Sequence, residues 1–143
     1  MCAIRRFWVG SVGIFALAHG LAVASDKPFT GTGVFQGQGR GCWGKLYIKE
    51  QSLEWNTPYS VCKKTSYSVI QKDLDSKSPH IAFALAQKSK KCGFEIIELS
   101  FDPVYPAYWQ ATGYETRKDF DNRAASNEEA ESKTLSCSVQ KSE

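Results

Sequence analysis

The chain lacks the residues that most hydrolytic enzymes need. It has only two histidines, and only His80 follows the N-terminal apolar segment. No Gly-x-Ser-x-Gly segment or comparable nucleophile context is present, so a Ser-His-Asp triad has no candidate nucleophile. His80 follows Pro79 at the start of an expected strand, and we interpret it as an ordinary surface residue.

Close cysteine pairs are also lacking. Intervals of 19, 29 and 44 residues separate Cys42, Cys62, Cys92 and Cys137. A thiolate zinc site and a thiol redox centre both favour a C-x-x-C spacing. We therefore expect no bound metal and no cofactor, and we expect the four cysteines to form two disulfides.

Carboxylates arranged for acid–base catalysis are not apparent. Glu95 and Glu98 fall on opposite faces of a regular strand, and the other closely spaced aspartates lie in expected turns, where Asp is favoured for local hydrogen bonding. Glycoside hydrolysis needs two carboxylates about 5–10 Å apart across a cleft. We expect a protein that is not an enzyme.

The first 24 residues have the pattern of a secretory signal peptide. Arg5 and Arg6 precede an uncharged run over residues 7–24, and Ala22-Val23-Ala24 stands before Ser25 as a small-residue cleavage site. The run is shorter than the ~20 apolar residues of a spanning helix. We expect residues 1–24 to be removed, leaving no membrane span.

The remaining residues, 25–143, are expected to form one β domain. They hold 16 basic and 15 acidic residues, a net charge of about +1. Nucleic-acid binding depends on a strongly basic surface, so we expect no nucleic-acid partner.

Alternation of apolar and polar residues predicts an all-β fold. Strands are expected over residues 42–49, 52–57, 66–70, 80–87, 94–101, 108–114 and 134–140, with a Gly-rich bent strand and turn over 31–44. This Gly-rich stretch leads into a strand rather than a helix, which argues against a phosphate-binding loop. Seven or eight short strands predict an antiparallel barrel or sandwich with two disulfides.

One hairpin has a predicted register. A two-residue turn at Glu50-Gln51 places Ile48 opposite Leu53 and Leu46 opposite Trp55.

Three other segments depart from regular strands. Ile96 is out of phase and suggests a bulge. Residues 115–122 are charged and predict a turn of helix, and residues 124–133 predict a mobile acidic loop.

Four cysteines allow three pairings. Cys42 begins one strand and Cys62 follows its hairpin partner, so these two could close one end of the sheet. Cys92 precedes the strand expected over residues 94–101, and antiparallel closure could bring Cys137 alongside it. We predict Cys42–Cys62 and Cys92–Cys137.

Aromatic residues are plentiful, with 15 after residue 24. Trp43 and Tyr47 fall on the lysine-bearing face of their strand, and Tyr105 and Tyr108 belong to an aromatic loop. Exposed aromatics beside charge are typical of interface hot spots, so these four are the candidate binding residues. Alternatively, the face that carries Trp43 and Tyr47 lies beneath an N- or C-terminal segment.

Several residues with fixed spacing are similar to those of a known group of proteins. They are Cys42-x-Gly44-x-Leu46-x-Ile48, Trp55-x-Thr57-Pro58-x-x-x-Cys62, Trp109-x-x-Thr112-Gly113-Tyr114 and Leu135-x-Cys137. With them the chain resembles small exported proteobacterial β proteins of uncharacterised function. Its size, two disulfides and β-rich layout are also loosely similar to periplasmic lysozyme inhibitors. The Ser-Gly-x-x-Tyr inhibitory motif of that group is not present.

These features predict a periplasmic or secreted protein that binds a partner, either a protein or another envelope macromolecule. The alternative is a small barrel that carries an apolar small-molecule ligand in its mouth. A small hydrolase is the third hypothesis.

Export gives the first testable prediction. Because cleavage is expected after Ala24, mass spectrometry of the protein from its native host should find a mature N-terminus near Ser25. Recovery of an intact segment from Met1 to Ala24 would instead identify a retained anchor.

Overall fold

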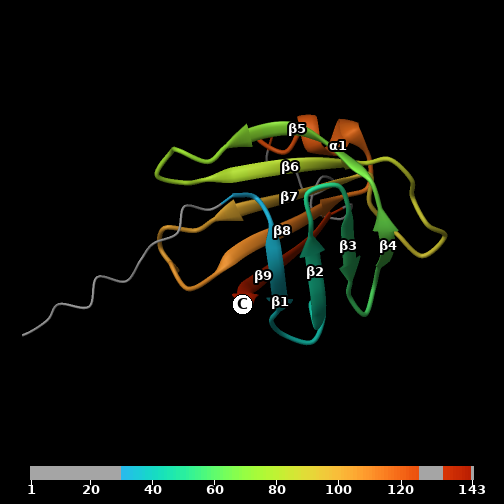
Figure 1. The fold of residues 1–143 in the computed structure, drawn as a ribbon, viewed down its shortest axis with the longest axis horizontal. Helices are drawn as coiled ribbons and strands as arrows, with labels where there is room; N and C mark the ends of the chain where they lie inside the picture. Colours follow the sequence, from blue (N-terminus) through green and yellow to red (C-terminus); the bar gives the residue numbers. More distant parts are fainter. Residues whose placement is uncertain (1–29, 126–133, 143) are drawn as a thin grey trace, which may run out of the picture.

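The computed structural model describes residues 30–125 and 134–142. The expected signal peptide and residues 126–133 of the expected mobile acidic loop lie outside this part of the chain. The described residues form nine strands and one short helix (Figure 1). They are β1 (Gly33–Gly37), β2 (Gly44–Ile48), β3 (Leu53–Asn56), β4 (Val61–Thr65), β5 (Tyr67–Asp73), β6 (His80–Leu85), β7 (Ile96–Phe101), β8 (Trp109–Tyr114), α1 (Arg117–Asp121) and β9 (Thr134–Ser142).

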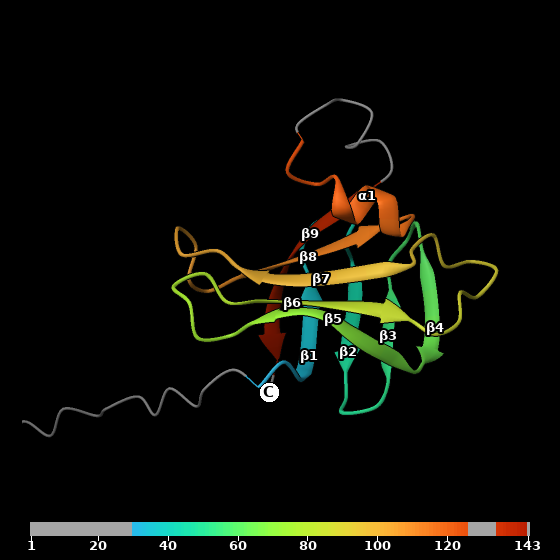
Figure 2. The ribbon, with the colours of Figure 1, turned by 90° about the horizontal axis from the view of Figure 1, so that it is seen from above.

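The strands form one antiparallel sheet in the order β4-β3-β2-β1-β9-β8-β7-β6-β5. In this alternating order β4 and β5, at opposite edges, run in the same direction, and only Ser66 separates them in sequence. They are two halves of one bent strand, so the sheet curls into a nearly closed barrel. Strands β1–β4 cross β5–β8 steeply (Figures 1 and 2). The predicted all-β antiparallel fold with two disulfides is confirmed. Of the two expected architectures, barrel or sandwich, the sheet forms the barrel, with nine strands among the described residues rather than seven or eight.

The β6–β7 loop, residues 86–95, lies along the start of β4. The Val61 amide donates to the Lys91 carbonyl at 2.9 Å, and the Gly93 amide donates to Ser60 Oγ at 2.9 Å. The Ser89 hydroxyl donates to the Val61 carbonyl at 2.9 Å. These bonds satisfy polar groups at the start of β4 on the edge that faces away from its partner strand β3.

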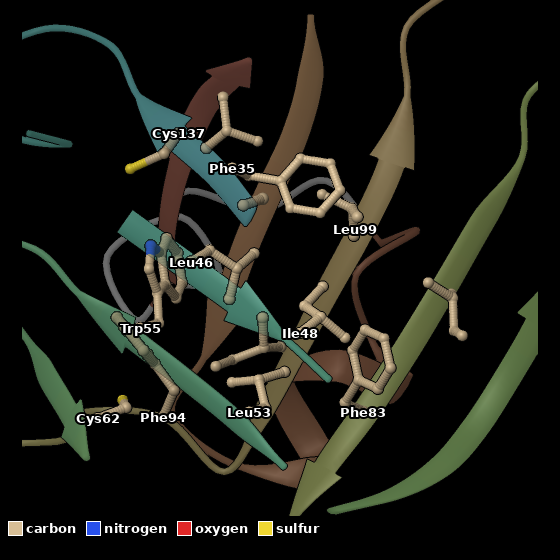
Figure 3. Close-up of a cluster of buried hydrophobic side chains, with 14 of the residues drawn as sticks. Phe35, Leu46, Ile48, Leu53, Trp55, Cys62, Phe83, Phe94, Leu99 and Cys137 are labelled. Carbon is tan, nitrogen blue, oxygen red and sulfur yellow. The ribbon is translucent and has the colours of Figure 1, made fainter. Parts of the chain in front are cut away.

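The barrel interior is filled by side chains from both halves of the sheet (Figure 3). Phe35, Leu46 and Trp55 from one half meet Phe83 and Leu99 from the other, and each is at most 1% exposed. Phe94, from the β6–β7 loop, packs on Trp55 with ring centroids 5.5 Å apart. Burial of these large apolar side chains is the main stabilising contribution to the fold.

The predicted hairpin register is confirmed: Leu46 pairs with Trp55 and Ile48 with Leu53. The Gly-rich stretch also forms the expected strand and turn, leading from β1 into β2. Gly44 has φ of +144°, and a Cβ there would collide with the carbonyl oxygen of Asn56, so the close approach of β2 and β3 requires glycine.

The bulge expected at Ile96 is wrong. Ile96 pairs regularly with Tyr114 and Ala84, and it is buried on the outer face of the sheet with Phe120. Helix α1 confirms the turn of helix predicted over residues 115–122 and covers this second cluster (Figure 2). An apolar residue out of phase therefore indicates a strand that is buried on both faces.

Strand β4 was not predicted. Its sequence, VCKKT, buries only Cys62, so the period-two signal that marks a half-buried strand is weak. Its pairing with β3 also shifts register between Leu53 and Trp55.

The predicted disulfide pairing is wrong: the bridges are Cys42–Cys137 and Cys62–Cys92. Cys62 lies opposite Trp55 in the neighbouring strand, whereas Cys42 lies in the β1–β2 connection. That connection runs beside β9, where the amide of Gln38 donates to the carbonyl of Ser138. The Cα atoms of Cys42 and Cys137 are 5.5 Å apart, and those of Cys62 and Cys92 are 4.4 Å apart. Local spacing could not reveal that β9 pairs with β1.

Peptide mapping of the unreduced protein should recover Cys42 with Cys137 and Cys62 with Cys92. The double variant Cys62→Ala/Cys92→Ala should lose about 2–4 kcal/mol of unfolding free energy. It should also exchange the amide hydrogens of Val61 and Gly93 faster, because the β6–β7 loop is no longer tied to β4. The double variant Cys42→Ala/Cys137→Ala should exchange these two amides no faster than its global loss of stability accounts for. Equal loosening in both variants would contradict this role of the Cys62–Cys92 bridge.

Candidate functional site

Two of the four predicted binding residues, Tyr105 and Tyr108, lie together at a surface pocket of about 300 Å³. Their side chains are 64% and 38% exposed. The same pocket is lined by Trp109 at the start of β8 and by four polar side chains. These are Gln38, Asp102, Gln110 and Ser138.

The β7–β8 loop presents an apolar surface with a defined backbone. All six residues of its 103–108 segment, PVYPAY, are exposed. Asp102 Oδ1 accepts from the Val104 amide at 2.8 Å, and the Tyr108 amide donates to the Tyr105 carbonyl at 2.9 Å. Pro103 and Pro106 restrict φ at two further positions. The loop therefore holds its two tyrosines in a pre-set arrangement.

Trp109 joins this loop to the core. Its ring makes edge contacts with Phe35 and Phe101, at centroid distances of 6.2 and 5.3 Å. The other wall of the pocket belongs to the sheet, where Gln110 pairs with Ser138 and the Gln38 amide donates to the Ser138 carbonyl at 3.0 Å. The polar wall is therefore positioned by β8, by β9 and by the residue that follows β1.

The other two predicted binding residues are placed apart from this pocket's lining. Trp43 is 71% exposed in the β1–β2 connection. Tyr47 lies on the outer face of β2, where it lines a separate, smaller pocket of about 160 Å³ with Lys49, Glu54 and Lys64, among others. The structure therefore does not unite all four aromatics in one pocket.

An exposed aromatic that sequence analysis missed is Tyr59. It is 79% exposed in the β3–β4 turn, and its ring would lie 3.2 Å from a Cβ at Gly41 in the β1–β2 connection. Its position directly after Pro58, in a turn, was the available signal.

The ionisable residues considered for catalysis are engaged locally. His80 lies at the start of β6 with Nδ1 3.4 Å from the Ser78 carbonyl oxygen. Glu95 precedes β7, so it is not part of the regular strand from which opposite faces were expected for Glu95 and Glu98. Glu95 accepts from the Arg117 amide at 3.2 Å, and Glu98 lies 3.6 Å from Arg123 Nε. Within residues 30–125 and 134–142, no group of three His, Cys, Asp or Glu side chains could hold a metal.

Tyr114 belongs to a polar network beneath α1. Its hydroxyl donates to Glu98 Oε2 at 2.7 Å, and Arg123 stacks on Phe120 with 3.9 Å from Cζ to the ring centroid. Burial, the hydrogen bond to Glu98 and the charge of Glu98 raise the pKa of Tyr114, whereas Arg123 acts to lower it. Tyr114 is 6% exposed within strand β8.

No protein-family model, curated protein or solved structure shows significant similarity to this chain. In the part of the chain that the structure describes, no helix is long and apolar enough to cross a membrane. The two disulfides indicate an oxidising, extracytoplasmic environment.

The network around Tyr114 gives a prediction for Tyr114→Phe. Loss of the bond to Glu98 should lower the unfolding free energy by about 1–3 kcal/mol at neutral pH. Because the folded-state pKa is raised, this tyrosine's contribution is fully present below about pH 10 and is lost as pH rises toward that pKa. The variant should therefore lose stability less steeply than the wild type above about pH 10.

Urea unfolding followed by tryptophan fluorescence, at neutral pH and at about pH 11, measures both effects. Tyr59→Phe, at an exposed tyrosine without a hydrogen bond to a described carboxylate, is the matched control. Identical pH dependence in Tyr114→Phe and the wild type would contradict the prediction.

Proposed function

We propose that this protein is a non-enzymatic binding module that recognises a macromolecule of the envelope, or one outside the cell, through its β7–β8 loop. The observation that carries the proposal is six consecutive exposed residues, PVYPAY, beside a pocket that the two tyrosines of this loop help to line. Exposed apolar patches rimmed by polar residues mark interaction sites. Aromatic anchors also dominate the free energy of many interfaces.

The backbone of the loop favours binding. Its turns and its two prolines reduce the conformational freedom that would be lost when a partner docks. Trp109 ties the loop to Phe35 in the core, so the binding surface rests on a rigid support.

The filled interior supports a surface binding role over the carriage of an apolar ligand. Phe35, Leu46 and Leu99, near the barrel axis, are each 0% exposed. A carrier would need this volume for its ligand. Engagement of Glu95 and Glu98 with the α1 segment likewise favours binding over hydrolysis.

The place of action that we propose is the periplasm or the cell exterior. The two disulfides and the signal-peptide pattern of residues 1–24 support export.

Capture of envelope components by the oxidised protein, followed by titration of the purified partner, tests the proposal. Tyr105→Ala and Tyr108→Ala should each weaken binding about 30-fold, corresponding to the ≥ 2 kcal/mol of a hot spot. The controls are Tyr47→Ala, on β2, and His80→Ala, on β6, which should bind within about threefold of the wild type.

Circular dichroism should verify that every variant is folded. Undiminished binding by folded Tyr105→Ala and Tyr108→Ala proteins would contradict the proposal. So would a loss of function confined to His80→Ala or to a variant of an acidic residue.

A further inference from the structure

We propose that the pocket beneath the β7–β8 loop binds one neutral hexopyranose ring of an oligosaccharide. This assignment rests on the proposed function and names the chemical class that its site recognises. The argument uses the hydrogen-bonding groups of the pocket, its aromatic rings, its charge and its size.

The pocket wall has several hydrogen-bonding side chains without partners. Among the described residues, the amides of Gln38 and Gln110 and the hydroxyl of Ser138 make no side-chain hydrogen bond to one another or to a neighbour. The hydroxyls of Tyr105 and Tyr108 are likewise unengaged within residues 30–125 and 134–142. Amides and hydroxyls can both donate and accept, which suits a ring whose hydroxyl groups do the same.

These groups stand beside aromatic rings. Tyr105, Tyr108 and Trp109 line the same pocket as the two glutamines. A pyranose ring has a face of C–H groups and a rim of hydroxyls. Aromatic rings present an electron-rich face that attracts such C–H groups, while polar side chains at the wall take the rim.

The charge of the pocket argues against an anionic ligand. Asp102 is the one carboxylate among the described lining residues, and no lysine or arginine lines the pocket with it. Asp102 Oδ1 accepts from the Val104 amide, which leaves Oδ2 as an acceptor for a ligand hydroxyl. Phosphate or uronic acid groups would meet an uncompensated negative charge.

The size and the polar wall favour a sugar over a peptide. A volume of about 300 Å³ is at the lower end of small-molecule sites, which span about 300–1,000 Å³, so the pocket suits one ring rather than several. Proline-rich peptides also dock on aromatic grooves. Such a peptide offers carbonyl acceptors but few N–H donors, so it would leave the amide oxygens of Gln38 and Gln110 without donors, whereas sugar hydroxyls can serve both atoms of each amide.

The test is a titration of the oxidised protein with neutral trisaccharides built from glucose, N-acetylglucosamine, galactose or mannose. Binding is followed by amide chemical shifts and tryptophan fluorescence. At least one trisaccharide should bind saturably with a Kd near 1 mM or tighter and shift the amides of Gln110 and Ser138.

Gln110→Leu keeps most of the side-chain volume but removes the amide, and it should weaken binding about 2- to 10-fold. Tyr108→Ala should weaken binding at least about 10-fold. Gln140→Leu is the matched control, because Gln140 lies on the outer face of β9 with Ser138 but outside the pocket lining; this variant should bind like the wild type.

Three results would overturn the sugar assignment. One is no saturable shift with any trisaccharide at about 10 mM. The second is saturable binding that is unaffected by Gln110→Leu and Tyr108→Ala. The third is preferential binding of a proline-rich peptide or an acidic glycan. If an envelope partner is lost in Tyr105→Ala and Tyr108→Ala, but no neutral trisaccharide competes with it, the sugar assignment fails and the proposed function stands.

Discussion

The structure depends on closure of the barrel where β4 bends into β5. The β6–β7 loop covers the start of β4 by hydrogen bonds, by the Cys62–Cys92 bridge and by insertion of Phe94. The Phe94 ring packs over Gly113, where a Cβ would lie 2.6 Å from ring carbons. One loop thus protects a strand edge and completes the core between the two halves of the sheet.

Strand β9 has the complementary role of joining those halves. Its first part pairs with β8 and its last part with β1, and the Cys42–Cys137 bridge fixes the β1–β2 connection to it. This arrangement brings Gln38 beside Ser138. The polar wall of the candidate site is therefore a consequence of how the barrel closes, and the β7–β8 loop adds the aromatic wall.

The outer face of β5–β8 shows how the fold uses its charged groups. Glu98 accepts from Tyr114 and pairs with Arg123, whose guanidinium stacks on Phe120. The hydrogen bond and the ion pair at this partly buried carboxylate connect the sheet to the end of the α1 segment. The β7–β8 loop, at the opposite end of β8 from α1, differs in that its aromatic side chains remain exposed.

Local physics determined much of this protein. Alternation predicted an antiparallel all-β barrel or sandwich and the register of Leu46 with Trp55, because a half-buried strand must repeat every two residues. The aromatic loop expected around Tyr105 and Tyr108 is also present, and both side chains are exposed. Tertiary structure alone decided the pairing of Cys42 with Cys137, the second core at Ile96 and the convergence of glutamines on the tyrosine loop. All three features depend on which strands become neighbours when the barrel closes. The residue pattern within a single strand does not determine its neighbours.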